Sequence, residues 1–156
     1  MRNQNFGRSG VWFYGLAGSG KTYASTEIAK VKQNPFVIDG DQVRRFISFD
    51  LGYSAEDRLT QLSRMYGIAK LAISNNYFPI VSTVTMSKKI LDSCTELAIE
   101  VVQIQRSFEV IKSLRAIYQS GSNVVGVDAK LEDLDTPSVF NNGTAQFVNE
   151  ILQYAE

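Results

Sequence analysis

The stretch Gly15-Leu-Ala-Gly-Ser-Gly-Lys-Thr22 decides the fold, because it fits the pattern G-x-x-x-x-G-K-[ST]. It ends Val11–Leu16, an aromatic and β-branched run that predicts a buried strand, and it opens Lys21–Val31, which has helical composition. A glycine-rich turn between a strand and a helix points backbone N–H groups and the positive end of the helix dipole at an anion. The stretch therefore predicts a phosphate-binding loop, or P-loop (Walker A), and not merely a turn that begins a helix.

Each position of this loop has a predicted role in holding ATP. Lys21 is expected to reach the β- and γ-phosphates, while the hydroxyl of Thr22 is expected to ligate Mg²⁺. The other contacts come from backbone N–H groups. The predicted ATP-binding residues are Gly15, Leu16, Ala17, Gly18, Ser19, Gly20, Lys21 and Thr22.

Predicted strands and helices alternate along the rest of the chain. The further strands are Phe36–Ile38, Tyr77–Val84, Ile99–Gln105 and Ser138–Phe140. The further helices are Ser54–Ser74, which starts at the capping-box sequence S-A-E-D, then Ser87–Leu97, Ser107–Tyr118 with Ser107 as cap, and Thr144–Tyr154. This alternation predicts one α/β domain over residues 1–156, a three-layer sandwich with a parallel sheet. Together with the loop at 15–22 it indicates a P-loop NTPase fold. The polar segment Gln119–Thr136 is predicted to be a mobile loop that acts as a lid.

The composition excludes several classes of function. Sixteen basic and sixteen acidic side chains cancel, so no general basic field attracts nucleic acid or a membrane surface. No apolar run approaches transmembrane length, and the single cysteine, Cys94, cannot form an internal disulfide, which suits a reducing cytoplasm. The chain has no histidine, so any general base must be a carboxylate. We expect a cytoplasmic protein that binds neither nucleic acid nor membranes.

The acidic turn Asp39-Gly-Asp41 is the candidate for that base. It follows the second predicted strand, and loops after parallel strands meet at the carboxyl edge of the sheet, close to the P-loop. Asp41 could accept the proton of an attacking hydroxyl, while Asp39 orients that group or holds Mg²⁺-bound water. The alternative is that one of these aspartates only caps the following helix. The predicted catalytic residues are thus Asp41, Asp39 and Lys21.

The absence of other motifs narrows the class to small kinases. A switch GTPase needs a guanine-reading N-K-x-D, which is absent, and no other predicted strand ends in the acid that motor ATPases use. Four arginines follow the acidic turn, and guanidinium groups favour bidentate grips on phosphate or sulfate. These are Arg44, Arg45, Arg58 and Arg64. The alternative for them is surface pairing with neighbouring acids, which contributes little stability.

Three motifs together resemble the adenosine 5′-phosphosulfate (APS) kinase family. They are GLAGSGKT (15–22), DGDQVR (39–44) and DLGYSAEDR (50–58), where the family has GLxGSGK[ST], DGDNxR and DLGFSxxDR. The resemblance covers about residues 10–90 and resumes weakly at NVVGVD (123–128). It implies a P-loop kinase that transfers the γ-phosphate of ATP to a nucleotide ribose 3′-hydroxyl. It also implies that Asp41 is the base and that Arg44 and Arg58 hold the acceptor.

The departures from the family pattern fall on the acceptor side. Gln61 replaces an Asn that contacts the substrate, and Tyr53 keeps one ring of an aromatic pair that stacks on adenine, whereas Val124 removes the other. Losing one face of such a stack costs about 1–3 kcal/mol. The residues that the resemblance assigns to binding of the acceptor are Asp41, Arg44, Tyr53, Arg58, Gln61 and Val124.

Three functional hypotheses follow from this pattern. The first is a kinase for cytidine diphosphoramidate or a similar modified nucleotide, since the family includes such kinases in capsular polysaccharide biosynthesis. The second is an APS kinase that makes 3′-phosphoadenylylsulfate. The third, from another class, is a catalytically degenerate nucleotide-binding regulator. For the kinases we expect ATP and a small nucleotide acceptor as partners, Mg²⁺ as cofactor, and a homodimer.

Overall fold

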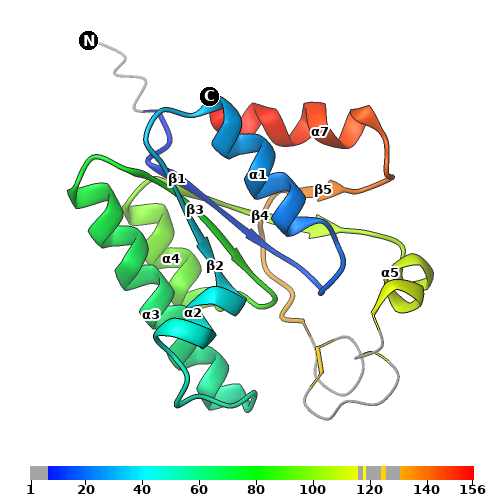
Figure 1. Cartoon of the computed structure of the whole chain (residues 1–156), viewed down its shortest axis with the longest axis horizontal. Helices are drawn as coiled ribbons and strands as arrows, with labels where there is room; N and C mark the ends of the chain where they lie inside the picture. The colour runs from blue at the N-terminus through cyan, green and yellow to red at the C-terminus, as the bar shows by residue number, and fades with distance from the viewer. Residues whose placement is uncertain (1–6, 116–117, 119–123, 126–130) are drawn as a thin grey trace.

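The computed structural model describes residues 7–115, 118, 124–125 and 131–156. Within this part of the chain lies a five-stranded sheet in the order β2-β3-β1-β4-β5, and every neighbouring pair is parallel (Figure 1). The strands are β1 (Gly10–Tyr14), β2 (Pro35–Asp39), β3 (Phe78–Thr83), β4 (Ile99–Gln105) and β5 (Ser138–Phe140). The helices are α1 (Lys21–Val31), α2 (Gly40–Phe46), α3 (Ala55–Ser74), α4 (Lys88–Glu96), α5 (Phe108–Leu114) and α7 (Ala145–Leu152), followed by the 3₁₀ turn Gln153–Ala155.

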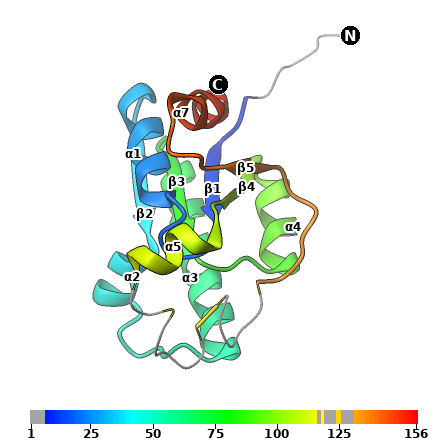
Figure 2. The same cartoon turned by 90° about the vertical axis from the view of Figure 1, so that its right-hand side faces the viewer.

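The helices form two layers, one on each face of the sheet. Helices α1 and α7 cover one face, and α3 and α4 cover the other (Figures 1 and 2). The predicted fold class, a three-layer α/β sandwich with a parallel sheet, is thereby confirmed. None of the described helices combines the length and apolarity needed to cross a membrane.

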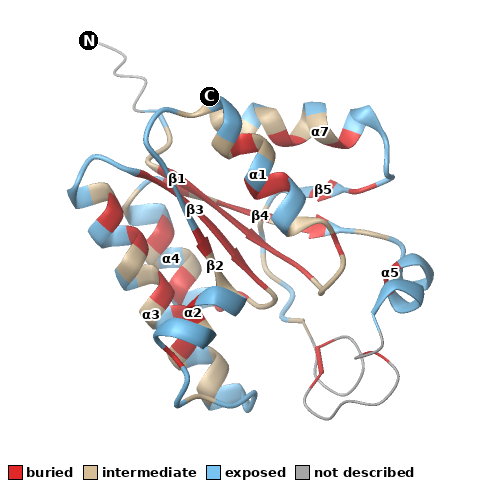
Figure 3. Ribbon diagram, viewed as in Figure 1, coloured by how far each residue is buried: buried red, intermediate tan, exposed pale blue. Residues whose placement is uncertain are grey.

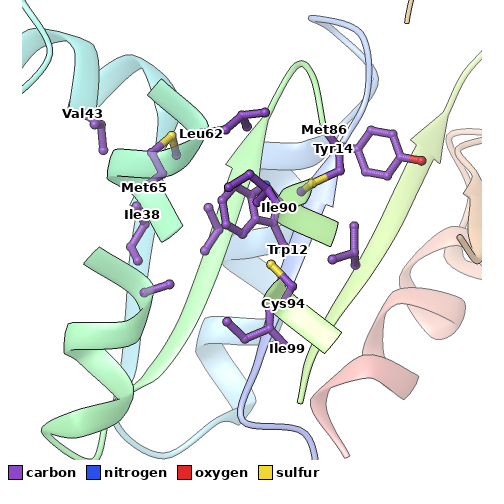
Figure 4. Packing of buried hydrophobic residues seen from close by; sticks show 13 residues of the cluster. Trp12, Tyr14, Ile38, Val43, Leu62, Met65, Met86, Ile90, Cys94 and Ile99 are labelled. Carbon is purple, nitrogen blue, oxygen red and sulfur yellow. The ribbon is translucent and has the colours of Figure 1, made fainter. Parts of the chain in front are cut away.

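Strand β1 shows how the sequence builds both layers of the core. All five of its residues are buried, as expected for the central strand of a sheet covered on both faces (Figure 3). Val11 and Phe13 pack in the cluster beneath α1 and α7, while Trp12 and Tyr14 pack in the cluster beneath α3 and α4. Figure 4 shows this second cluster, where Cys94 is one of the buried residues.

A hydrogen-bonded pair inside that core shapes the end of β3. The indole Nε1 of Trp12 donates to Oγ1 of Thr83 at 2.9 Å. The same hydroxyl donates to the backbone carbonyl of Thr85 at 2.6 Å, so one threonine satisfies the buried indole and bends the chain beyond the strand. These two hydrogen bonds link Trp12, in the core cluster beneath α3 and α4, to the loop that follows β3.

Most predicted elements are found within two residues of their expected bounds, with two instructive differences. Strand β1 ends at Tyr14 rather than Leu16, because the chain leaves the strand at Gly15, which has a φ angle of 153°. Only a glycine fits there, since an added Cβ would lie 2.3 Å from the carbonyl oxygen of Ile104. Helix α5 ends at Leu114, because Arg115 is extended, so the helix predicted to run without a break to Tyr118 is interrupted at Arg115, although Tyr118 itself is helical. Only Ile111 of α5 is buried, which leaves little packing to support further turns.

Helix α5 is preceded by Ser107, its predicted cap, and followed by the predicted lid. Ser107 occupies the N-cap position of α5, but its side chain makes no capping hydrogen bond. Of the predicted lid, Gln119–Thr136, residues 119–123 and 126–130 lie outside the described residues. Its last part is held on the core, because Leu131 and Leu134 pack against the α3–α4 cluster.

The Trp12–Thr83 hydrogen bond yields a prediction about stability. Thr83→Val keeps the shape of the side chain but leaves a buried indole N–H without its acceptor, so the free energy of unfolding should fall by about 1–3 kcal/mol in urea titrations. The matched control is Thr85→Val, which removes a hydroxyl outside this network and should cost less than about 1 kcal/mol. Equal losses in the two variants would show that the indole bond does not stabilise the fold.

Candidate active site

The P-loop takes a conformation that only glycine accommodates. Gly15 and Gly20 have φ angles of 153° and 110°. A Cβ on Gly20 would lie 2.5 Å from Nδ2 of Asn141, which donates to the carbonyl of Ser19 at 2.9 Å. Gly20 is the N-cap of α1 and supplies no capping side chain, so the first N–H groups of the helix face the loop. The loop is therefore built to receive an anion at the start of α1.

Lys21 is held inside the loop by the loop's own carbonyls. Its ammonium Nζ donates to the carbonyl oxygens of Gly15 and Leu16 at 2.7 and 3.0 Å. Burial lowers the pKa of Lys21 to about 8; the carboxylate of Asp41 opposes this shift, and the guanidinium of Arg115 adds to it. A phosphate group at the loop would replace the two carbonyls as the partner of this ammonium.

The P-loop forms one wall of a hollow, which we call the donor hollow. It has a volume of about 510 Å³, a size typical of small-molecule sites. Lys21 and Thr22 line it together with Asp39 at the end of β2 and Asp41 at the start of α2. The sequence prediction that the acidic turn lies beside the phosphate loop is therefore matched by the geometry.

The two aspartates of the turn have different surroundings. Asp39 caps α2: its Oδ2 accepts from the backbone N–H of Gln42 at 3.1 Å, and its Oδ1 accepts from the hydroxyl of Ser82 at 3.3 Å. The alternative considered for this turn, helix capping, is thus correct for Asp39. Asp41 lies in the first turn of α2, is exposed, and lines two hollows. Its carboxylate is the more available of the two for chemistry.

The second of these hollows, which we call the acceptor hollow, has a volume of only about 70 Å³. It shares Gly40, Asp41, Thr83 and Val84 with the donor hollow, so the two are neighbours across the acidic turn. Five of the six residues predicted to bind the acceptor line it, namely Asp41, Arg44, Tyr53, Arg58 and Gln61. The structure thus brings together side chains from α2, α3 and the loop between them.

The sixth predicted residue, Val124, lies elsewhere. It is buried in a small cluster with Ile111 and Tyr118, against Leu16 and Ala17 of the P-loop, and it is not among the residues lining the acceptor hollow. The aromatic ring that does line this hollow is Tyr53. Val124 packs on the donor side of the site.

Two arginines of the acceptor hollow lie against the ring of Tyr53. The Cζ atoms of Arg44 and Arg58 are 4.3 and 5.5 Å from the ring centre. Arg44 also donates to the carbonyl of Gly52 at 2.8 Å, and Arg58 donates to the carbonyl of Tyr53 at 3.1 Å. The guanidinium groups thus occupy the small hollow together with the ring, which explains its size.

Arg64 has a structural partner instead of a place in either hollow. It forms a bidentate pair with Asp50, with N···O distances of 2.6 and 2.9 Å, and it donates to Ser48 at 3.2 Å. Of the two roles considered for the arginines, Arg64 therefore has the second, pairing with a neighbouring acid in place of a grip on the substrate. The pair ties the loop that carries Tyr53 to α3, as does Asp57, whose carboxylate accepts from the backbone N–H of Gly52.

The residues around the donor hollow suit Mg²⁺ bound chiefly by phosphates. The described residues contain no group of three or more acidic, histidine or cysteine side chains that could hold a metal without a substrate. The exposed hydroxyl of Thr22 and the carboxylates of Asp39 and Asp41 do line the hollow. Mg²⁺ commonly takes one or two such ligands together with substrate phosphates and waters, so this set fits the ion.

Sequence reasoning missed three residues of the donor side. Arg106, directly after β4, lines the donor hollow and donates to the carbonyl of Gly18 at 3.2 Å, and Arg115 lines the same hollow. Asn141, after β5, supports the P-loop as described above. All three follow β4 in the sequence, and β4 and β5 lie on the opposite side of β1 from β2 and its acidic turn. The rule that strand ends meet at the carboxyl edge could have found Arg106 and Asn141.

This combination of P-loop, parallel sheet and acidic turn defines the class of P-loop kinases. Comparison with known families is more specific, since the family model described as Adenylylsulphate kinase matches residues 8–130. The chain belongs to the adenylylsulphate kinase family. It is accordingly an ATP-binding phosphotransferase of the class that uses an alcohol group as acceptor.

Individual relatives agree with this placement. The adenylyl-sulfate kinase of Clostridium kluyveri is 30% identical over an alignment of 175 positions, which covers 99% of this chain and 87% of that protein. The adenylyl-sulfate kinase of Halothermothrix orenii is 28% identical, with 100% of this chain and 92% of that protein covered. Among solved structures, the Mycobacterium tuberculosis APS kinase in complex with AMPPNP and APS superposes with a TM-score of 0.82 at 20% identity, covering 95% of this chain and 96% of that one. The structural likeness supports the same fold.

The lowered pKa of Lys21 predicts how nucleotide binding depends on pH. The ammonium is fully charged well below its pKa of about 8 and loses its charge as the pH rises through that value. Since the charged form binds phosphate, affinity for a non-hydrolysable ATP analogue should weaken by up to about tenfold between about pH 7 and about pH 9. Calorimetric titration with the ATP analogue at several pH values in this range measures the affinity.

The control for that titration is Lys21→Arg, whose guanidinium stays charged over the whole range. Its affinity should be lower at every pH, but the dependence on pH should flatten. The same slope in both proteins would assign the titration to another group, and a flat wild-type profile would contradict the role of Lys21.

Proposed function

We propose that the protein transfers the γ-phosphate of ATP to the ribose 3′-hydroxyl of a nucleotide, with adenosine 5′-phosphosulfate as the leading acceptor. The observation that carries this proposal is the position of Asp41, which lines both the donor and the acceptor hollow. A carboxylate between two adjoining sites can accept a proton from a hydroxyl bound in one while that hydroxyl attacks a phosphate bound in the other. Membership in the adenylylsulphate kinase family favours APS as the acceptor.

On the donor side, this chain's own residues bind and orient the triphosphate. The N–H groups at the start of α1 receive the β-phosphate, and Lys21 exchanges its bonds to Gly15 and Leu16 for phosphate oxygens. Thr22 would hold Mg²⁺ through its hydroxyl, with Asp39 reaching it through ordered water, and the bound ion neutralises charge on the phosphates. Arg106 and Arg115 add positive charge along the same hollow.

On the acceptor side, the reaction needs one proton acceptor and one anion grip. Asp41 takes the proton of the 3′-hydroxyl while the oxygen of that hydroxyl bonds to the γ-phosphorus of ATP. The bond from that phosphorus to the leaving oxygen of ADP breaks. Arg44 and Arg58 bind the anionic group of the acceptor, which releases the ring of Tyr53 to stack on the base. The substrate thereby takes over contacts that these residues now make with one another.

A second acceptor, cytidine diphosphoramidate, is favoured by one specific observation. Among the described residues, Tyr53 is the aromatic residue that lines the acceptor hollow, while Val124 is buried against the P-loop. A site with one stacking ring holds a large purine less strongly, whereas a smaller pyrimidine loses less. The relatives named adenylyl-sulfate kinase nevertheless favour APS as the leading acceptor of this proposal.

Turnover with each acceptor tests the proposal. The purified protein, given ATP and Mg²⁺, should convert APS to a 3′-phosphorylated product, measured by chromatography and by the location of the new phosphate. Cytidine diphosphoramidate is assayed in parallel, and a higher kcat/KM for it would reverse the order of the two acceptors. ATP binding without transfer to either acceptor would contradict a kinase and favour a nucleotide-binding regulator.

Asp41→Asn tests the proposed base. The substitution keeps the size of the side chain but removes its capacity to accept a proton, so kcat should fall by about 100-fold or more while ATP affinity changes by less than about twofold. The control is Asp92→Asn on α4, where the exposed carboxylate pairs with Lys88 and neither residue lines the donor or the acceptor hollow. Turnover of Asp41→Asn near the control's value would remove Asp41 as the base.

A further inference from the structure

Strand β2 is an edge of the sheet that lies open to solvent. It is the last strand on its side, and within the described residues β3 is the one strand paired with it. Its first three residues are exposed: Pro35, Phe36 at 43% and Val37 at 42%. Residues 35–38 carry no charge. Natural proteins usually protect an open edge with charges, bulges or a covering segment, because its unpaired backbone groups can bind another strand.

Apolar side chains flank this edge on both faces of the sheet. On the face covered by α3, Phe36 lines a groove of about 310 Å³. The other residues of that groove are Ile68, Leu71, Ala72, Asn75 and Tyr77. Successive side chains of a strand point to opposite faces, so Val37 lies on the face of α1, where Val31 at the end of that helix is 59% exposed. Exposed apolar surface on both sides of an unpaired strand is typical of a protein–protein interface.

The hydrogen bonds to β3 show which backbone groups of β2 face outward. The N–H of Phe78 in β3 donates to the carbonyl of Asn34 at 2.8 Å, so the backbone of Asn34 faces β3. In a parallel pair alternate residues bond to the same neighbour, so the even-numbered residues of β2 bond to β3 and the odd-numbered ones face away. The outward residues are Pro35, Val37 and Asp39. The backbone groups of Val37 have no hydrogen-bond partner among the described residues.

These outward groups are complementary to a second copy of the same strand. When two copies of β2 run antiparallel with Val37 opposite Val37, the two valines exchange two N–H···O=C bonds. Two residues further on, the N–H of Asp39 meets the carbonyl of Pro35 of the other copy. Proline has no N–H to donate in return, and none is needed, because the carbonyl of Asp39, the N-cap of α2, accepts the first bond within that helix. The strand therefore matches itself about a two-fold axis at Val37.

We propose that two copies of this chain pair through their β2 edges, antiparallel and centred on Val37, so that the two sheets form one continuous sheet. A two-fold contact uses the same patch on both copies, so each copy covers the apolar groove beside Phe36 of the other. Charge does not oppose the pairing. The carboxylate of Asp39 is bonded within its own chain to the N–H of Gln42 and the hydroxyl of Ser82.

The pairing also acts on the acidic turn, because β2 runs directly into it. Asp39 is both the last residue of β2 and the N-cap of α2. A carbonyl from the second copy on the N–H of Asp39 fixes the start of α2, the helix that carries Asp41. Each copy thus supports the acidic turn of the other. This inference goes beyond the proposed phosphoryl transfer and does not depend on it.

Disulfide cross-linking tests the register of the pairing. Opposite residues in a hydrogen-bonded antiparallel pair have Cα atoms about 5.5 Å apart, which a disulfide can span. Val37→Cys should therefore form a covalent dimer on mild oxidation, seen by electrophoresis without reductant. Pro35→Cys is the matched control on the same edge, because its two copies lie about 14 Å apart and should stay unlinked. Cross-linking of neither variant, or equal cross-linking of both, would overturn the proposed register.

Sedimentation of a charged variant tests the interface itself. Wild-type protein should sediment as a dimer, whereas Val37→Lys places two ammonium groups against each other on the axis and should weaken association by about 100-fold or more. Val110→Lys on α5, where the valine is 40% exposed, is the matched control and should remain a dimer. Both valines are exposed, so thermal unfolding should show that both variants are folded. A monomeric wild-type protein, or a Val37→Lys variant that stays dimeric, would contradict the proposal.

Amide hydrogen exchange locates the contact directly. The N–H groups of residue 37 and of Asp39 should exchange about 100-fold more slowly in the wild-type dimer than in Val37→Lys. Fast exchange at these positions in a wild-type dimer would place the interface elsewhere, and slow exchange in a wild-type monomer would mean that another segment covers the edge; either result overturns the pairing. None of these measurements needs an acceptor. If the protein phosphorylates no nucleotide, the proposed function fails while the interface is still decided.

Discussion

The parallel register of β1, β2 and β3 is the constraint on which the site depends. It pairs Asp39 with Ser82 and Tyr14 with Thr83, so the three strands end at one level of the sheet. The backbone N–H of Gly15 then donates to the carbonyl of Thr83 at 3.2 Å, which joins the start of the P-loop to the end of β3. An acidic turn and a phosphate loop that are far apart in sequence thus share one hollow, and the position of the carboxylate between two sites follows from strand pairing.

Contacts within the protein involve the side chains that we propose bind the ligands. Lys21 is bonded to carbonyls of its own loop, Arg44 and Arg58 lie on Tyr53, and Arg64 is bound to Asp50. The first three cations lie in the hollows and have a phosphate group as a stronger partner, whereas the pairing of Arg64 supports the loop that presents Tyr53. The cations of this region therefore have two different roles: Lys21, Arg44 and Arg58 are available to a bound phosphate, whereas Arg64 stabilises the protein itself.

Local patterns predicted the fold, while contacts between distant segments decided the details of the site. The loop at 15–22 and the alternation of strands and helices specify their own geometry, so the sheet, α1 and α3 were predictable. The pairing of Arg64 with Asp50, the support of the P-loop by Asn141 and the burial of Val124 depend on packing that no local pattern encodes. Aligning Val124 with an aromatic position of the family predicted an acceptor contact, whereas in this structure the valine packs with Ile111 and Tyr118 beside the P-loop.

A crystal structure with a non-hydrolysable ATP analogue and a nucleotide acceptor tests the central claim most directly, namely that Asp41 serves both sites. The account predicts the triphosphate on the P-loop, the acceptor ribose in the enlarged acceptor hollow, and the 3′-hydroxyl within about 2.6–3.2 Å of the Asp41 carboxylate and in line with the γ-phosphate. An acceptor bound outside the hollow lined by Arg44, Tyr53 and Gln61, or a carboxylate of Asp41 turned away from the ribose, would contradict it.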